Sequence, residues 1–328
     1  MIIINIGLLV LGIILLIKGS DFFVDSGSRI GKILNISEIL LGMTIVSLGT
    51  SLPELIVAIN GAQTGSNGVV IGNIIGTNIF NICAILAILC IIKPIKFLKE
   101  TVRKDMYMSL LSTVVLFVLM ADRIFDGGVG VNVINRADGI ILLLFFGVFM
   151  YYSLYHYIEN RHEKPKEEVK LKLKDIDELT KKILLMILGI AMVFIGGDIA
   201  VDAVVKLASA FRISETFIAI MVLAIGTSLP EIFTSIAAVK KHKNEMAIGN
   251  LIGSSIFNIL FVLGTSSLIH PIVLPMDSLL VDTFLFAIVS AMLIMFARNK
   301  GKYEMSKLEG YCLLSIYAMY VFYVIVRK

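Results

Sequence analysis

Long apolar runs alternate with short polar segments along almost the whole chain. A helix needs about 20 apolar residues to cross a bilayer, with shorter and longer variants. Ten runs are close to that length, at residues 2–18, 38–60, 69–92, 106–121, 138–157, 183–197, 214–238, 246–269, 279–297 and 308–326. The pattern therefore predicts an all-α polytopic membrane protein with ten transmembrane helices.

The composition of the 328-residue chain supports this class. Hydrophobic residues make up 58% and charged residues only 16%, whereas soluble domains hold about a quarter charged residues. The small net charge of +4 gives no reason to expect nucleic-acid binding. All three cysteines lie in apolar runs without metal-ligand spacing, so we expect neither a disulfide framework nor a cysteine metal site.

Two sequence strings occur twice. Gly-Thr-Ser-Leu-Pro-Glu occupies residues 49–54 and 226–231, and GNIIGTNIFN at 72–81 is matched by GNLIGSSIFN at 249–258. Both pairs are separated by 177 positions, so the chain contains an internal duplication. We expect a first transmembrane half at 1–157, a charged linker at 158–182 and a second half at 183–328.

Five spans in each half imply that the second half enters the membrane from the opposite side. The expected fold is therefore two inverted five-helix repeats. The loops after the odd-numbered spans hold 23 of the 29 Lys and Arg residues, and cytoplasmic loops carry such an excess. We expect a multi-pass protein of the cell membrane with both termini extracellular and the central linker cytoplasmic.

The repeated hexapeptide predicts that the second and seventh helices are broken. Gly49 interrupts an apolar run and Pro53 removes a backbone donor, which would leave carbonyl groups unpaired at midspan. Irregular backbone at that depth is tolerated only where it lines a cavity or is buried in protein. Ser51 and Glu54 also fit the Ser-x-x-Glu capping box, as do Ser228 and Glu231.

A capping role does not explain a glutamate at midspan in both halves. A charged side chain at the centre of a membrane helix costs at least about 2.5 to 3.5 kcal/mol on insertion scales, and such residues commonly mark ion pathways. The positive end of the new half-helix would favour the ionised carboxylate. Glu54 and Glu231 are therefore the central candidates for binding a cation.

Neutral oxygen groups complete the candidate set. Asn73, Thr77 and Asn81 recur every four residues and should share one helix face, as should Asn250, Ser254 and Asn258. Oxygen ligands without Cys or His suit hard cations such as Ca²⁺ or Na⁺. Thr50 and Thr227 stand four residues before the two glutamates, so the candidate metal ligands from the pattern are Glu54, Glu231, Thr50, Thr227, Asn81, Asn258, Thr77 and Ser254.

Two further features have plainer interpretations. Gly72, Gly76, Gly249 and Gly253 form small-xxx-small patterns that favour close helix packing. The charges after the first span, among them Asp21 and Asp25, are typical of a helix end with a solvated face.

The paired GTSLPE strings, each followed by GN-x-x-G-[ST]-x-x-x-N, resemble the alpha-repeats of the sodium/calcium exchanger family within the cation/calcium exchanger superfamily. The resemblance implies antiport of Na⁺ against Ca²⁺ by alternating access, with the first and sixth spans sliding across a bundle of eight helices. It also implies that Ser51 and Ser228 join these eight residues as metal ligands, that the four Ser and Thr residues of the hexapeptides bind through hydroxyl or carbonyl oxygens, and that the backbone carbonyls of Ser47 and Ala224 are further, weaker candidates. The transported ions and the lipid bilayer would be the partners, without a prosthetic group, and a monomer is compatible with this function.

One departure and three alternatives follow. Many relatives carry Asp where this chain has Asn258, which weakens the case for K⁺ co-transport. A proton/calcium antiporter typically shows a GN-x-x-E arrangement that is absent here, and a passive cation channel would not need inverted broken-helix repeats. An enzyme is not expected, because no His ligand, nucleophile–base pair or nucleotide loop accompanies Glu54.

Overall fold

The computed structural model describes residues 2–126, 131–163, 173–210, 226–274, 278–298 and 301–326. The chain is mostly helical, with four two-residue strands. Its first half contains α1 (Ile2–Leu34), α2 (Glu38–Leu41), η1 (Gly42–Val46), α3 (Ser47–Thr50), α4 (Leu52–Gln63), α5 (Asn67–Phe80), η2 (Asn81–Leu86), α6 (Ala87–Ile92), β1 (Ile95–Lys96), η3 (Thr101–Asp105), α7 (Met106–Leu119), α8 (Asp122–Phe125), β2 (Val133–Ile134) and α9 (Arg136–Glu163), where η denotes a π-helical segment.

The described part of the second half repeats much of this order of elements. It contains α10 (Leu173–Ala210), α12 (Leu229–Lys240), α13 (Asn244–Ile256), η4 (Phe257–Leu263), α14 (Gly264–Ile269), β3 (Ile272–Val273), α15 (Ser278–Ala297), β4 (Glu304–Met305) and α16 (Lys307–Val326). Several bounds recur at the 177-residue offset: α12 begins and ends 177 residues after α4, and α14 does so after α6.

Membrane-spanning character is clear for most of the expected spans. Within the described residues, seven helices are long and apolar enough to cross a membrane. A pair, Glu38–Thr50 with Leu52–Gln63, passes the same test together and is bent by 45°. The expected span at 106–121 corresponds to the 14-residue α7, and the span at 214–238 lies partly outside the described residues. The count of ten therefore stays a prediction.

The chain divides into two compact units, each of which draws on both sequence halves. The first unit comprises residues 1–50 and 152–250, and the second comprises residues 51–151 and 251–328. The predicted boundaries at 157 and 183 separate the two copies of the duplication and not the two compact units, and they stay a prediction.

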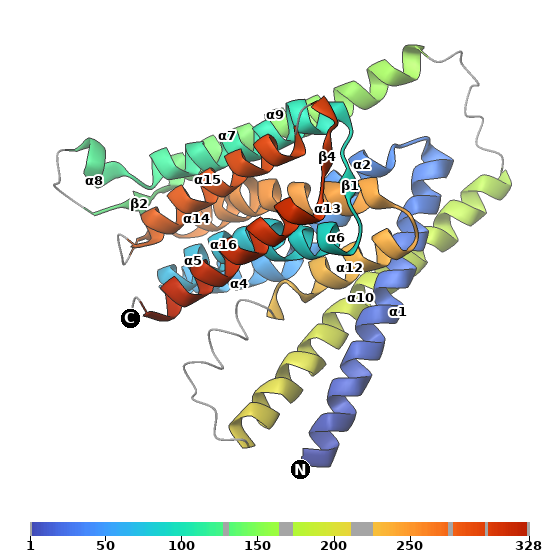
Figure 1. Ribbon diagram of the computed structural model, residues 1–328, viewed down its shortest axis with the longest axis horizontal. Helices are drawn as coiled ribbons and strands as arrows, with labels where there is room; N and C mark the ends of the chain where they lie inside the picture. Colours follow the sequence, from blue (N-terminus) through green and yellow to red (C-terminus); the bar gives the residue numbers. More distant parts are fainter. Residues whose placement is uncertain are drawn as a thin grey trace. The chain divides into compact units, whose positions relative to one another are not determined.

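In the first unit, α1 and α10 pack side by side along their length (Figure 1). A Cβ atom on Gly12 would lie 2.7 Å from the carbonyl oxygen of Gly196, and one on Gly19 would lie 2.8 Å from that of Gly189. The pairing order shows that the two helices run antiparallel. Gly189 and Gly196 lie 177 residues after Gly12 and Gly19, so the duplicated glycines form both crossing points.

The rest of the first unit packs α2, η1, α3 and α12 against this pair. Its apolar cluster includes Phe23, Leu41 and Val46 with Ala238 and Met246. Gly49 lies inside α3, where an added Cβ would lie 3.0 Å from Phe23 Cζ. The second helix therefore breaks within the predicted hexapeptide, but at Ser51 and not at Gly49, which permits close packing at the end of α3.

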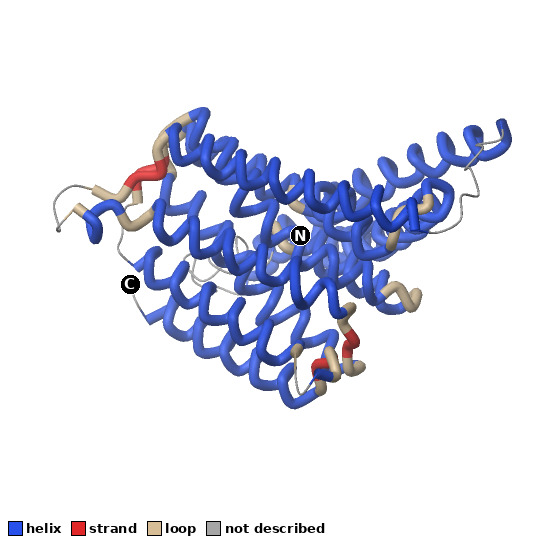
Figure 2. Tube along the Cα trace, turned by 90° about the horizontal axis from the view of Figure 1, so that it is seen from above, coloured by secondary structure: helices blue, strands red, loops and turns tan. Residues whose placement is uncertain are grey.

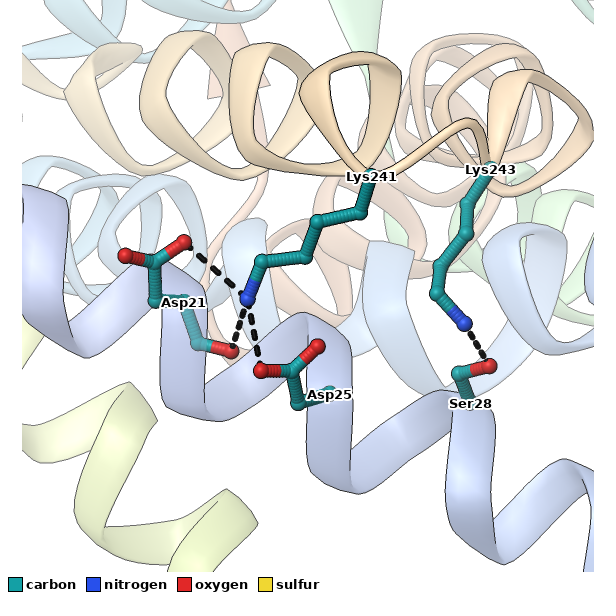
Figure 3. Close-up of polar contacts among 5 residues, drawn as sticks. All are labelled: Asp21, Asp25, Ser28, Lys241 and Lys243. Carbon is teal, nitrogen blue, oxygen red and sulfur yellow. Dashed lines mark hydrogen bonds and ion pairs between the residues drawn. The ribbon is translucent and has the colours of Figure 1, made fainter.

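Two lysines join the end of α12 and the start of α13 to α1 (Figure 3). Lys241 Nζ lies 3.0 Å from Asp21 Oδ1 and 2.7 Å from Asp25 Oδ2. Lys243 Nζ donates to Ser28 Oγ and lies 3.4 Å from Glu38 Oε1. Asp21 and Asp25 remain partly solvated, as expected, but they also form ion pairs.

The second unit is a helix bundle with a two-stranded sheet at each end (Figure 2). The strand β1 pairs antiparallel with β4, and β2 pairs antiparallel with β3. The helix α15 packs on α7, and α16 packs on α6. Thr283 near the start of α15 contacts Met120 just after the end of α7, so these two helices run antiparallel.

Candidate cation-binding residues

The hexapeptide of the first half lies at the bend between α3 and α4. Ser51 separates the two helices, and Pro53 occupies the second residue of α4, where a missing backbone donor costs no helical hydrogen bond. The equivalent Ser228 precedes α12, which carries Pro230 at the same place. Two predictions, the break of the seventh helix and the ligand role of the Ala224 carbonyl group, concern residues 211–225, which lie outside the described residues.

The predicted capping boxes are not formed. Ser51 and Ser228 occupy the N-cap positions, but neither side chain accepts a capping hydrogen bond. The reason is the backbone: φ and ψ are −87° and 7° at Ser51, whereas an N-cap needs an extended conformation. Ser37, with φ −67° and ψ 149°, does cap its helix, because its side chain accepts a hydrogen bond from Leu40 N.

Both repeated glutamates lie in the first turn of a helix and are fully buried. Glu54 is the third residue of α4, and Glu231 is the third residue of α12, each with 0% exposure. The positive end of the helix dipole stabilises a carboxylate at this position. Glu54 belongs to the second unit and Glu231 to the first.

In the first unit, neutral oxygen groups form a hydrogen-bonded chain. Thr50 Oγ1 donates to Asn250 Oδ1 at 3.0 Å, and Asn250 Nδ2 donates to Ser235 Oγ at 3.3 Å. The carbonyl oxygen of Ser47 lies 3.4 Å from Thr50 Oγ1. Thr50, Asn250 and Ser235 are all buried, so the structure brings the threonine of one string against the asparagine of the other.

In the second unit, the carboxamides of Asn78, Asn81 and Asn258 are fully buried. Asn258 Nδ2 donates to Asn78 Oδ1 at 3.1 Å, and Asn78 Nδ2 donates to the carbonyl oxygen of Ser255 at 3.3 Å. Among the described residues, Asn258 Oδ1 has no hydrogen-bond partner, and neither does either amide atom of Asn81 or the hydroxyl of Ser51. Thr77 and Ser254 are buried as well.

These unpartnered oxygen atoms fit the chemistry of a cation ligand. A buried polar atom without a partner costs about 1 to 3 kcal/mol, and such atoms are few in native structures. Carboxylate, hydroxyl and amide oxygens are the ligands that hard cations prefer. Within the described residues, no three His, Cys, Asp or Glu side chains come together, so a cation in either unit would depend on neutral oxygen atoms.

π-helical turns accompany the asparagines. The segment η2 begins at Asn81, and η4 begins at Phe257, directly before Asn258. Such turns are rare and are frequent at functional sites. A π turn widens the helix locally and thereby changes which side chains share a face.

Asn78 and Ser235 are contact residues that the sequence analysis missed. Asn78 directly follows Thr77 and so lies off the four-residue stripe. The only sequence feature that could have indicated Asn78 is the 177-residue offset of the duplication, which pairs it with Ser255. Asp282 in α15 was missed too, and this carboxylate is buried at 1% exposure.

The glycine pattern holds in part. A Cβ on Gly249 would lie 2.5 Å from the carbonyl oxygen of Ile39, and one on Gly42 would lie 2.4 Å from that of Met246. These glycines therefore permit close backbone contact. Around Gly72 and Gly76, no atom of the described residues lies within 4 Å of an added Cβ.

Comparisons with known proteins agree with this arrangement. Residues 4–155 and 181–326 match the family model described as "Sodium/calcium exchanger protein". The chain is 31% identical to the sodium/calcium exchanger MaX1 of Methanosarcina acetivorans over 98% of each sequence. It is 34% identical to the inner membrane protein YrbG of Escherichia coli over 80% of this chain and 79% of YrbG.

A solved structure is similar over the full length. The sodium-calcium exchanger NCX_Mj, soaked with 10 mM Na⁺ and zero Ca²⁺, matches with a TM-score of 0.82 at 30% identity. The match covers 100% of both chains.

Proposed function

Because the chain belongs to the sodium/calcium exchanger family, we propose that it exchanges Na⁺ for Ca²⁺ across the membrane by alternating access. Its fold and family are those of a multi-pass cation/Ca²⁺ exchanger and not of an enzyme. The identity of the counter-ion and of the ligands is the part that we propose. One observation carries it: a fully buried glutamate stands in the first turn of both α4 and α12.

The proposed ligands combine two charges with neutral oxygen atoms. Glu54 and Glu231 are the central ligands for both ions. The further proposed ligands are the hydroxyl or amide groups of Thr50, Thr227, Ser51, Ser228, Thr77, Ser254, Asn81 and Asn258. Two carboxylates neutralise one divalent ion or more than one Na⁺, so competition between these occupancies would couple the two fluxes.

We propose that these groups belong to ten spans arranged as two inverted repeats. The recurrence of helix bounds at an offset of 177 and the antiparallel run of α1 and α10 support this arrangement. Inverted repeats with broken helices are typical of secondary transporters. The excess of Lys and Arg after the odd-numbered spans supports extracellular termini and a cytoplasmic linker.

A proton/calcium antiporter and a passive cation channel are the competing functions. The wild-type protein in proteoliposomes separates the three. Vesicles loaded with Na⁺ or with choline are diluted into medium containing ⁴⁵Ca²⁺, and a third set carries a pH gradient without Na⁺. We expect uptake only from Na⁺-loaded vesicles.

Two other results would contradict the proposal. Uptake driven equally well by the pH gradient would indicate proton coupling. Uptake that is indifferent to both gradients would indicate a channel.

A further inference from the structure

We infer that Asn78 is a positioning residue, which fixes the side-chain amide of Asn258 so that its Oδ1 atom is presented to the transported cation. The inference rests on the proposed function, because it assigns a role to a neighbour of a proposed ligand. Asn78, Asn258 and Ser255 all belong to the second unit, and the side chains of all three are fully buried.

Ser255 supplies a backbone oxygen atom whose hydrogen-bonding role is fixed. The carbonyl oxygen of Ser255 can only accept a hydrogen bond. Asn78 must therefore turn its NH₂ group toward this oxygen, and Nδ2 lies 3.3 Å away. Ser255 lies two residues before η4, and a change from α to π turns can leave a backbone carbonyl available to a side-chain donor.

The orientation of Asn78 then determines that of Asn258. With its NH₂ group on Ser255, Asn78 presents Oδ1 to Asn258, and this oxygen can only accept. Asn258 must therefore direct Nδ2 toward it, at the observed 3.1 Å. A reversed Asn258 amide would bring two oxygen atoms together without a proton between them.

The result is a buried amide oxygen with a fixed direction. Asn258 Oδ1 has no hydrogen-bond partner among the described residues. A neutral oxygen of this kind is a suitable ligand for Ca²⁺ or Na⁺. The bond from Asn78 holds it in place before a cation arrives, which lowers the ordering cost of binding.

The two halves differ at this point. Ser255 stands at the position equivalent to Asn78, and Asn81 at the position equivalent to Asn258. Ser255 Oγ donates to Leu251 O in its own helix at 3.0 Å, and the amide of Asn81 has no partner among the described residues. Only the Asn258 amide is therefore held by this pair of hydrogen bonds.

The difference between the two halves indicates a variant that should fold, Asn78→Ser. Serine already occupies the equivalent position in the second half, so Asn78→Ser places a residue that this backbone accepts. Its hydroxyl should bond to its own helix as that of Ser255 does, and it would not reach Asn258. Ser112→Ala is the matched control, because Ser112 is buried in α7 of the same unit and donates to Met108 O within that helix.

The test measures Na⁺-driven ⁴⁵Ca²⁺ uptake as a function of Ca²⁺ concentration in proteoliposomes. For Asn78→Ser we expect the half-saturating Ca²⁺ concentration to rise about tenfold, as expected for one weakened ligand, while the maximal rate changes less. Ser112→Ala should stay close to wild type. If Asn78→Ser also stays within about twofold, the inference is wrong.

A double-mutant cycle separates positioning from a general structural role. If Asn78 acts through Asn258, Asn78→Ser should add less than about a twofold change in a protein that already carries Asn258→Ala. Full additivity would overturn the inference. Asn78→Leu repeats the cycle with a side chain of similar size, and the same non-additivity is expected. A wild-type protein without Na⁺-driven uptake would refute the proposed function instead.

Discussion

Asn81 and Asn258 place neutral oxygen atoms where an acid would add charge. With Glu54 and Glu231 as the two repeated buried acids, the proposed ligand set carries two negative charges when both are ionised. Two charges balance one Ca²⁺ without a third carboxylate. The amides supply oxygen ligands without adding charge repulsion between neighbouring ligands. This favours a site that binds either one divalent ion or several monovalent ions.

Ser51 permits a test of ligation against helix capping. Its hydroxyl makes no capping bond and has no partner among the described residues. Ser51→Ala should therefore weaken Ca²⁺ binding while sparing thermal stability, and Ca²⁺ titration and thermal denaturation measure these two effects. Loss of a working N-cap costs about 1 kcal/mol. A drop in stability comparable to that of Ser37→Ala, which removes a working cap, would contradict this account.

The sequence predicted most of the candidate residues because duplication made them visible. Repetition of GTSLPE identified Glu54 and Glu231, and both proved buried. Asn78 could not be found in this way, because its equivalent is Ser255 and its role depends on a contact between segments 177 residues apart. The capping boxes failed for a local reason, since residue spacing does not reveal the φ and ψ angles of Ser51.

At the scale of elements, the α1–α10 pair depends on glycines that hydropathy alone does not reveal. Gly12 and Gly19 permit the backbone of α1 to approach that of α10 at two points. Close approach by small residues is a main source of helix association in membranes, where lipid removes most of the hydrophobic driving force. The proposed sliding of these helices would have to preserve both contacts, so we expect α1 and α10 to move as one body.

Adjacent glycines on α10 test this packing. Gly196→Ala would place a Cβ 2.8 Å from Gly12 O and 2.7 Å from Leu15 Cβ, whereas no atom lies within 4 Å of an added Cβ on Gly197 among the described residues. Gly196→Ala should lower thermal stability by an amount typical of overpacking, about 1 to 3 kcal/mol. Gly197→Ala should be neutral or slightly stabilising. Equal melting temperatures for the two variants would argue against the close crossing.

Lys241, just after the end of α12, forms ion pairs with Asp21 and Asp25 of α1 (Figure 3). Lys241→Met should lower the melting temperature, because Asp21 and Asp25 would lose their shared cation. Partly exposed ion pairs contribute up to about 1 kcal/mol each and are screened by salt. The loss should therefore shrink in concentrated choline chloride, which avoids adding Na⁺. The adjacent, exposed Lys240→Met is the control, and a loss that persists unchanged in salt would contradict the electrostatic explanation.

At the scale of the whole molecule, the sequence predicts how the chain crosses the membrane. Seven apolar helices and one bent pair accord with most of the ten predicted spans. The element bounds that recur after 177 residues extend the duplication from short strings to whole helices. Hydropathy could not predict the compact units, because each combines segments from both halves through contacts that are distant in sequence.

The proposed orientation has a direct test. A short epitope inserted in the linker at 158–182 should be digested by protease only after the cells are made permeable. An epitope before the first span should be digested in intact cells. The positive-inside bias of 23 of 29 basic residues supplies the physical reason. The opposite protection pattern would reverse the assignment of extracellular termini.

The central claim is that the two buried glutamates bind the transported cations. The most direct measurement compares Na⁺-driven ⁴⁵Ca²⁺ uptake of the wild type with that of Glu54→Gln and Glu231→Gln. The exposed Glu100→Gln serves as the control for loss of a carboxylate. We expect each buried-site variant to fold and to lose about 100-fold or more of its uptake, equivalent to roughly 2.7 kcal/mol, while Glu100→Gln transports normally. Uptake near the wild-type rate in either buried-site variant would contradict the account.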